Sequence, residues 1–307
     1  MSYNFSQGAW PTMITPFSDD GSVDYNALGR LIDWYIENGA DGLFADCQSS
    51  EIFFLSLEER IKIAEFVIEK ANKRVPVIAS GHVSYDVNDQ IKELNAIAAC
   101  GVDAVILISN RLATQNESDD IFLKRLDVIV NSLPKETALG FYECPYPYKR
   151  LLTPKIINYC TASGRFYFLK DTCCDAKQIA EKIALLKGSH MQFFNANTAT
   201  LVDSLKLGGA GYSGVMANFQ MKLYSWIVKN WDKDAEVTQE VQNLLTVCSF
   251  IELKNYPANA KCSLNLNGVT MNELVRKGSQ VPQNETEILE LKQILSLTRA
   301  TEAKLSI

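Results

Sequence analysis

Several signatures of other protein classes are missing from this chain of 307 residues. It has two histidines, no cysteine pair at C-x-x-C spacing, and no apolar run near the ~18 residues that a membrane span needs. Residues 1–10 lack the basic start and apolar stretch of a secretory signal. The net charge is −6 and no stripe of lysine and arginine appears, which argues against a nucleic-acid partner. We therefore expect a cytoplasmic protein without membrane or nucleic-acid partners.

The few metal-binding and redox-capable residues are interpreted as structural. Neither His82 nor His190 has a second ligand at metal spacing, so no metal site is predicted. Several of the eight cysteines lie in apolar segments, where a free thiol behaves as a small hydrophobe. Adjacent cysteines such as Cys173 and Cys174 rarely bridge, so packing in a reducing compartment is the favoured interpretation.

The chain alternates short apolar runs with longer amphipathic ones. Hydrophobic residues make up 47% of it, enough for a large core. Ser56 and Glu59 predict a capping box, and Thr153-Pro154 predicts a second helix start. The expected strands are 10–17, 41–46, 75–80, 104–109, 137–142, 166–169, 191–194 and 210–214; the expected helices are 24–38, 56–72, 87–100, 119–132, one from 153, 175–186, 198–207 and 219–229.

Eight strand–helix units predict an α/β fold with a parallel sheet buried on both faces. Their total length is that of a closed (β/α)8 TIM barrel, which we place at residues 1–232 with the active site. Residues 233–307 are expected to add about three helices packed on the barrel. A doubly wound open sheet is the main alternative, although no G-x-G-x-x-G follows the first strand.

Candidate active-site residues lie where strands end, because the carboxyl ends of barrel strands carry the chemistry. Lys170 follows the apolar strand 166–169. Burial of a lysine favours the neutral amine, which can attack a ketone and form an imine. Tyr142 ends the neighbouring strand and could move protons for that reaction. The alternatives are a lysine that extends to solvent and a core tyrosine with a satisfied hydroxyl.

A Ser-Ser pair follows the second strand. Ser49 and Ser50 could offer hydroxyls and turn amides to a carboxylate, although such a pair is more often a cap or a turn. Glu51 and Asp171 are predicted to position loops rather than to titrate during catalysis.

These segments together resemble one family, the dihydrodipicolinate synthase / N-acetylneuraminate lyase family of class I aldolases. The resemblance extends from Gly8 to about Gly268. Residues 8–17 look like the family's first strand, and 39–43 and 55–60 flank its substrate loop. Residues 142–145 match the segment of the proton-shuttling tyrosine, and 168–172 match that of the Schiff-base lysine. Residues 208–211 and 217–218 resemble the eighth unit, which implies that Ser213 lies near the lysine.

Three departures from the family pattern concern the second substrate. The loop 47–51 reads C-Q-S-S-E, so Gln48 replaces a hydroxyl residue and both family glycines are absent. Residues 108–110 lack the tyrosine that joins the synthase proton relay. The synthase arginine is replaced by Pro147, and the nearest cations are Lys149 and Arg150. A second substrate other than aspartate semialdehyde is therefore expected.

The resemblance implies a class I Schiff-base lyase or aldolase that needs no cofactor. It would release pyruvate, condense it with an aldehyde, or dehydrate a sugar-derived 2-oxo acid. Relatives imply a homo-oligomer, either tetramer or dimer. The alternatives are a true 4-hydroxy-tetrahydrodipicolinate synthase with an altered relay and a non-catalytic barrel with a sensing or structural role. The implied site residues are Lys170 and Tyr142 for catalysis, and Gln48, Ser49, Ser50 and Ser213 for substrate binding.

Overall fold

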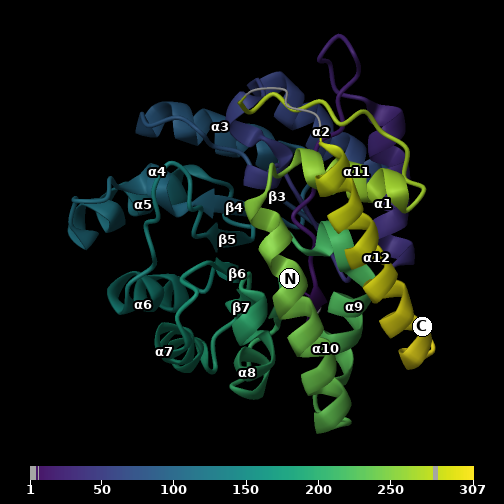
Figure 1. The fold of residues 1–307 in the computed structure, drawn as a ribbon. Coiled ribbons are helices and arrows are strands. Elements are labelled where there is room, and N and C mark those ends of the chain that lie inside the picture. The colour runs from purple at the N-terminus through teal and green to yellow at the C-terminus, as the bar shows by residue number, and fades with distance from the viewer. Residues whose placement is uncertain (1–4, 6, 279–282) are drawn as a thin grey trace.

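The computed structural model describes residues 5, 7–278 and 283–307, and its eight parallel strands follow the order β1-β8-β7-β6-β5-β4-β3-β2 (Figure 1). The two end strands and the residues beside them are joined by hydrogen bonds from Asp41 N to Ala9 O (3.0 Å) and from Phe44 N to Pro11 O (3.1 Å). The sheet therefore closes on itself, and the predicted (β/α)8 barrel is confirmed. The strands are β1 (Gly8–Ala9), β2 (Leu43–Ala45), β3 (Val77–Ser80), β4 (Ala104–Ile108), β5 (Leu139–Tyr142), β6 (Phe166–Asp171), β7 (Gln192–Asn195) and β8 (Gly211–Tyr212).

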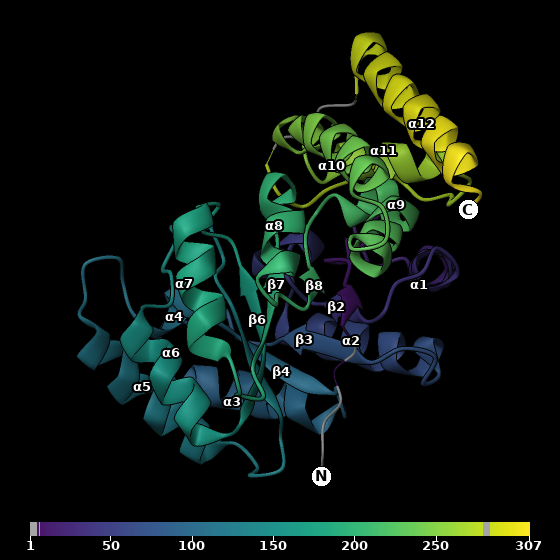
Figure 2. The same cartoon turned by 90° about the horizontal axis from the view of Figure 1, so that it is seen from below.

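Helices surround the strands, and local sequence signals set where they begin (Figures 1 and 2). Ser56 Oγ accepts a hydrogen bond from Glu59 N (3.2 Å) and Glu59 Oε2 accepts one from Ser56 N (2.9 Å), so the predicted capping box is present. Thr153 caps a helix whose first residue is Pro154, also as predicted. The barrel helices are α1 (Tyr25–Glu37), α2 (Leu57–Ala71), α3 (Val87–Ala99), α4 (Ser109–Leu112), α5 (Asp119–Ser132), α6 (Pro154–Ser163), α7 (Ala176–Leu186), α8 (Leu201–Lys206) and α9 (Ala217–Asn230), with short 3-10 helices η1 (Gln48–Ser50), η2 (Ile52–Phe54) and η3 (Thr198–Thr200).

Two apolar cores flank the sheet. Inside the barrel, Phe168 and Phe194 stack with their ring centroids 4.2 Å apart, and Trp10 packs edge-on against both. Alternate residues of the same strands, such as Leu169 and Phe193, join the core under the helices. Because both faces of each strand are buried, the strands read as continuous apolar runs.

The first strand differs from the prediction, which placed it at residues 10–17. The regular ladder of β1 comprises Gly8–Ala9, and the residues that follow make isolated contacts, Thr12 with Phe44 and Phe17 with Val23. Two prolines, Pro11 and Pro16, interrupt this segment. Proline has no backbone N–H to give to a ladder, so the segment is buried without being a continuous strand.

Helices of the C-terminal region pack beside α9, on the side of the barrel away from α3–α6 (Figure 2). A buried hydrogen bond from Gln220 Nε2 to Thr298 Oγ1 (2.8 Å) connects α9 to the last helix. The three α-helices expected after the barrel are thus present in the described residues. Among all the helices of the described residues, none is long and apolar enough to cross a membrane. The elements are α10 (Ala235–Cys248), η4 (Ser249–Leu253), α11 (Ala258–Leu266) and α12 (Glu285–Leu305).

Glycine is required where β1 meets β8. Gly8 and Gly211 are direct partners in this parallel pair, and a Cβ on Gly211 would lie 1.8 Å from the Gly8 carbonyl oxygen. No side chain fits into that space, because the obstructing atom belongs to the backbone of the neighbouring strand.

Gly211→Ala should therefore destabilise the barrel, lowering the free energy of unfolding by about 2 kcal/mol or more through overpacking. Urea denaturation followed by circular dichroism would measure the change. Gly29→Ala is the matched control, because its added Cβ would lie 3.5 Å from the Phe66 ring in an ordinary contact inside α1. That variant should be neutral or slightly stabilising. Equal stability of the two variants would contradict this account of the β1–β8 contact.

Candidate active site

Tyr142 and Lys170 lie side by side at the carboxyl ends of β5 and β6. They are register partners in the parallel pair, and the Lys170 Nζ lies 3.9 Å from the centroid of the Tyr142 ring. Lys170 belongs to β6 itself, which is two residues longer than the predicted strand 166–169. Both residues are buried, with 3% of Lys170 and 4% of Tyr142 exposed. The amine and the phenol thus face the interior of the barrel rather than bulk water.

Burial makes Lys170 a better nucleophile. Desolvation lowers the pKa of its amine from 10.5 to about 8, because removal of water disfavours the ammonium form. The nearby thiols of Cys47 and Cys144 would oppose this shift if they were ionised. Burial raises the pKa of both thiols, which therefore stay neutral near pH 7. At that pH roughly one Lys170 in ten is an uncharged amine.

Tyr142 keeps its proton near neutral pH. Burial raises the pKa of its phenol well above the usual 10. Its hydroxyl donates a hydrogen bond to Gln48 Oε1 (3.3 Å), and Cys144 Sγ lies 3.3 Å from the same oxygen. The phenol can act as a proton donor to a group bound above Lys170. Its protein partner is an amide, which does not pass protons on as a hydroxyl does.

These residues surround a cavity of about 240 Å³. At about 30 Å³ for each water in the liquid, that space holds roughly eight waters. A small organic acid therefore fits in this space. The described residues contain no group of three or more His, Cys, Asp or Glu side chains placed to hold a metal ion.

Two of the four predicted substrate-binding residues line this cavity, namely Gln48 and Ser49. Ser49 Oγ also bonds Thr12 Oγ1 (3.1 Å). Ser50 instead supports the loop, because its Oγ donates to Met13 O (3.0 Å) and accepts from Cys47 N (2.8 Å).

The fourth predicted residue, Ser213, lies one residue away from the cavity wall. Its backbone N donates to Asn195 O (2.9 Å), and the buried Oγ has no hydrogen-bond partner among the described residues. The residues that follow it, Gly214 and Val215, line the cavity.

A buried ion-pair triad lies behind the Tyr142–Lys170 pair, on the outer face of the sheet. Lys182 Nζ of α7 lies 2.6 Å from Glu143 Oε1 and 2.6 Å from Asp171 Oδ2. Glu143 and Asp171 directly follow the two site residues in sequence. Glu143 Oε1 also accepts from Leu152 N (2.7 Å). Asp171 does not line the cavity, and its carboxylate accepts a hydrogen bond from Cys173 N (3.0 Å); its predicted role in positioning a loop stays a prediction.

The C-terminal region supplies cavity residues that the sequence reasoning missed. Glu252 of η4, Tyr256 and Lys277 all line the cavity. Desolvation raises the pKa of the Glu252 carboxyl above its ordinary value, and the charge of Lys170 opposes this. Tyr256 Oη accepts a hydrogen bond from Asn218 Nδ2 (3.2 Å). The sequence analysis considered residues at the ends of predicted strands, and these three residues lie beyond the last strand. No motif indicated them.

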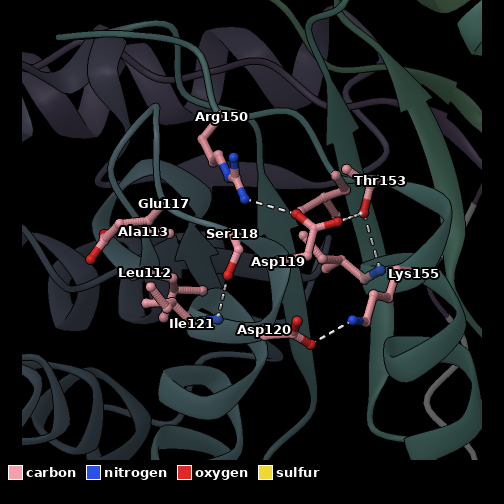
Figure 3. A network of polar contacts seen from close by, with 12 residues as sticks. Leu112, Ala113, Glu117, Ser118, Asp119, Asp120, Ile121, Arg150, Thr153 and Lys155 are labelled. Atoms are coloured by element: carbon pink, nitrogen blue, oxygen red, sulfur yellow. Dashed lines mark hydrogen bonds and ion pairs between the residues drawn. The ribbon is translucent and has the colours of Figure 1, made fainter.

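Asn110 and Arg150, which lie in or near segments that depart from the family pattern, have structural partners. Asn110, in the segment that lacks the relay tyrosine, donates from Nδ2 to the carbonyls of Cys144 (2.8 Å) and Tyr148 (2.7 Å). Arg150 pairs with Asp119 (2.8 Å), and Thr153 Oγ1 donates to the same carboxylate (2.6 Å), as Figure 3 shows. Arg150 is not among the cavity-lining residues, whereas Lys149 is.

Both histidines have structural surroundings. His82 Nδ1 bonds Gln90 Oε1 (2.8 Å), and its Nε2 accepts from Ile108 N (2.6 Å). Burial lowers the pKa of His82 to about 4, so its ring is neutral at physiological pH. His190 stacks on the Tyr167 ring at 5.6 Å. All eight cysteines are free and five of them are buried, in agreement with the packing interpretation.

Comparison with known proteins identifies relatives over nearly the whole chain. The model of the dihydrodipicolinate synthetase family matches residues 5–298. A 4-hydroxy-tetrahydrodipicolinate synthase of Bacillus velezensis is 28% identical over 288 residues, covering 92% of this chain and 96% of the relative. The synthase of Bacillus subtilis is 27% identical over 287 residues, with the same coverage.

Solved structures share the fold at lower identity. YagE of Escherichia coli K12, a prophage protein of the dihydrodipicolinic acid synthase family in complex with pyruvate, aligns with a TM-score of 0.86 at 24% identity. That alignment covers 95% of this chain and 98% of YagE. A monomeric dihydrodipicolinate synthase variant aligns with a TM-score of 0.86 at 19% identity, covering 96% and 97% of the two chains.

The lowered pKa of Lys170 predicts a pH dependence for its reaction with carbonyl compounds. The rate should rise about tenfold per pH unit below the pKa of about 8 and level off above it, because the neutral amine is the reacting form. The initial rate of borohydride-trapped adduct formation with pyruvate, measured by intact mass from pH 6 to 9.5, tests this. A rate still rising tenfold per unit above pH 9 would indicate an unperturbed lysine.

Removal of the Lys182 charge should destabilise the protein strongly. Lys182→Met leaves two buried carboxylates without their cation, and the expected loss is about 3–5 kcal/mol in the free energy of unfolding at pH 7. Urea denaturation measures the loss. Lys177→Met, at an exposed position of the same helix α7, is the control and should change stability by less than about 0.5 kcal/mol. Similar values for both variants would refute a stabilising role for the triad.

Proposed function

The chain belongs to the dihydrodipicolinate synthetase family, and within it we propose a class I lyase or aldolase that forms an imine between Lys170 and a 2-oxo acid such as pyruvate. Enzymes of this family are lyases, which agrees with the proposed reaction class. The observation that supports it most directly is the buried Lys170 amine, with a pKa near 8, against the Tyr142 ring.

Imine formation would proceed in two stages. The neutral Lys170 amine attacks the ketone carbon of the 2-oxo acid, and proton transfer from nitrogen to oxygen gives a carbinolamine. Tyr142 then donates its proton to the carbinolamine hydroxyl, which leaves as water while the nitrogen lone pair forms the C=N bond. The protonated imine withdraws electrons from the neighbouring carbon–carbon bond. This electron sink supplies the electrophile from the protein itself.

Cleavage of a 2-oxo-4-hydroxy acid would use the same groups. The tyrosinate left after water loss takes the proton of the substrate C4 hydroxyl. The C3–C4 bond breaks, the C4 oxygen becomes an aldehyde carbonyl, and the electron pair moves into an enamine on Lys170. Protonation of the enamine and hydrolysis release pyruvate and regenerate the amine. Condensation with an aldehyde is the reverse sequence.

Binding of the 2-oxo acid carboxylate is assigned to the loop after β2. Ser49 has a hydroxyl at the cavity wall, and Gln48 adjoins Tyr142. Ser50 would shape the loop through its bonds to Met13 and Cys47 rather than touch the substrate. For Ser213, the buried hydroxyl makes an indirect role behind the cavity wall the better assignment.

A true synthase activity is the second candidate, and the names of the curated relatives favour it. Two features oppose it. Pro147 has no charge to hold a second carboxylate where the synthases place an arginine. Arg150, three residues further on, is paired with Asp119 (Figure 3) and does not line the cavity. We therefore expect a different second substrate. The expected homo-oligomeric state stays a prediction.

Reductive trapping tests the proposed function. Incubation with pyruvate and borohydride should add one 1-carboxyethyl group to Lys170, located by peptide mass spectrometry, and Lys170→Ala should abolish the adduct. Tyr142→Phe should slow trapping by about 100-fold or more, because general acid catalysis is lost. Tyr159→Phe is the control, since its hydroxyl bonds Asp127 away from the cavity.

Folded protein that binds pyruvate without reaction would instead indicate the sensing or structural alternative. The two catalytic candidates are separated by a panel assay. Pyruvate release from sugar-derived 2-oxo acids is expected, and consumption of aspartate semialdehyde with pyruvate is not. Rapid consumption of that semialdehyde would establish the synthase instead.

A further inference from the structure

Basic side chains outnumber acidic ones along the cavity. Three lysines line the cavity, Lys149, Lys170 and Lys277, against one carboxylate, Glu252. Since Lys170 reacts as the neutral amine, the two remaining lysines outnumber the carboxylate in the reactive state. Neither Lys149 nor Lys277 has an ion-pair partner among the described residues. Both are exposed, so their charge is available to a bound molecule.

Lys277 is placed at the cavity by a buried carboxylate. Glu51 Oε2 accepts hydrogen bonds from the backbone N of Arg276 (2.6 Å) and of Lys277 (2.7 Å). Glu51 is itself paired with Lys261 (3.5 Å), and both side chains are fully buried. The Lys277 Nζ extends from this anchor to 5.7 Å from the Tyr146 ring. Glu51, in the loop after β2, therefore fixes the backbone position of Lys277, although the two residues are far apart in the sequence.

Lys149 lies on the same loop as Tyr146. Its Nζ donates to the carbonyl oxygen of Thr172 (2.7 Å), and Thr172 also lines the cavity. Asn110 Nδ2 stabilises this loop by donating hydrogen bonds to the carbonyl oxygens of Tyr146 (2.9 Å) and Tyr148 (2.7 Å). Both cations thus border the β5–α6 loop. Glu252 enters the cavity from η4, in the C-terminal helical region.

We infer that Lys277 and Lys149 are specificity-determining residues that select an aldehyde half of the substrate ending in an anionic group. The inference rests on the proposed function, because it concerns the end of the substrate away from the imine. The 2-oxo acid carboxylate is assigned to the loop at Gln48 and Ser49. The two lysines at the mouth then meet the opposite end, where a neutral tail would leave them without a partner and a purely anionic group would bind both. Aspartate semialdehyde does not fit this requirement, because the ammonium group beside its carboxylate would be repelled by the two lysines.

A carboxylate and a phosphate share the required charge, so the test includes both. Wild-type enzyme is assayed for condensation of pyruvate with succinic semialdehyde against its methyl ester, and with glyceraldehyde 3-phosphate against glyceraldehyde. For at least one pair, kcat/KM should be roughly tenfold higher for the charged aldehyde, a preference that salt reduces by screening. The pair that shows it identifies the anion.

Single variants assign the effect to residues. Lys277→Met and Lys149→Met should each lower the ratio of kcat/KM for the charged over the neutral aldehyde, by roughly tenfold for a lost charge-assisted contact. Lys177→Met carries the same substitution at the start of α7, outside the cavity lining, and should leave the ratio unchanged.

Trapping with pyruvate and borohydride separates the two hypotheses. If wild-type protein forms no adduct on Lys170, the proposed function itself is refuted. If the adduct forms but neither charged aldehyde reacts faster than its neutral partner, the specificity inference is wrong while the imine chemistry stands. The inference is also wrong if the lysine variants lower both rates equally or if Lys177→Met gives the same fall in the ratio.

Discussion

Lys182 joins the ends of the two strands that carry the reactive groups. Its ammonium contacts Glu143 and Asp171, the residues directly after Tyr142 and Lys170, on the outer face of the sheet. Successive strand residues point to opposite faces of the sheet. A contact that fixes Glu143 and Asp171 on the outer face therefore also fixes their neighbours Tyr142 and Lys170 on the inner face. Coulomb attraction between these buried groups holds the two strand ends in register beside the buried Lys170 amine.

Burial has opposite consequences on the two faces of these strands. Outside, the Lys182 ammonium contacts both carboxyl groups and backbone amides donate to them, while burial and the neighbouring Asp171 raise the pKa of Glu143 to about 7. Inside, Lys170 has no carboxylate within ion-pair distance among the described residues, and its proton affinity falls. Lys182 and Lys170 are both buried, so the opposite shifts of their pKa values follow from the two carboxyl groups in contact with Lys182.

Much of the architecture was predictable from local patterns, because both faces of each strand pack against apolar side chains and most helices carry a capping residue. The exception was the segment 10–17. Its buried apolar residues do not form a continuous strand, because Pro11 and Pro16 have no backbone N–H to donate to a neighbouring strand. The placement of Lys170 beside Tyr142 followed from strands ending at one rim. Glu252, Tyr256 and Lys277 were not predictable, because a helical segment beyond the barrel folds back over that rim.

The Glu51 anchor separates the backbone of the C-terminal segment from its side chains. It binds residues 276 and 277 through main-chain amides, which every residue except proline possesses. A point mutation at 277 therefore keeps the anchor and changes only the group at the rim. Duplicated copies of such a gene can therefore diverge in substrate specificity through a single codon change at position 277. The reactive residues on the strands stay unchanged.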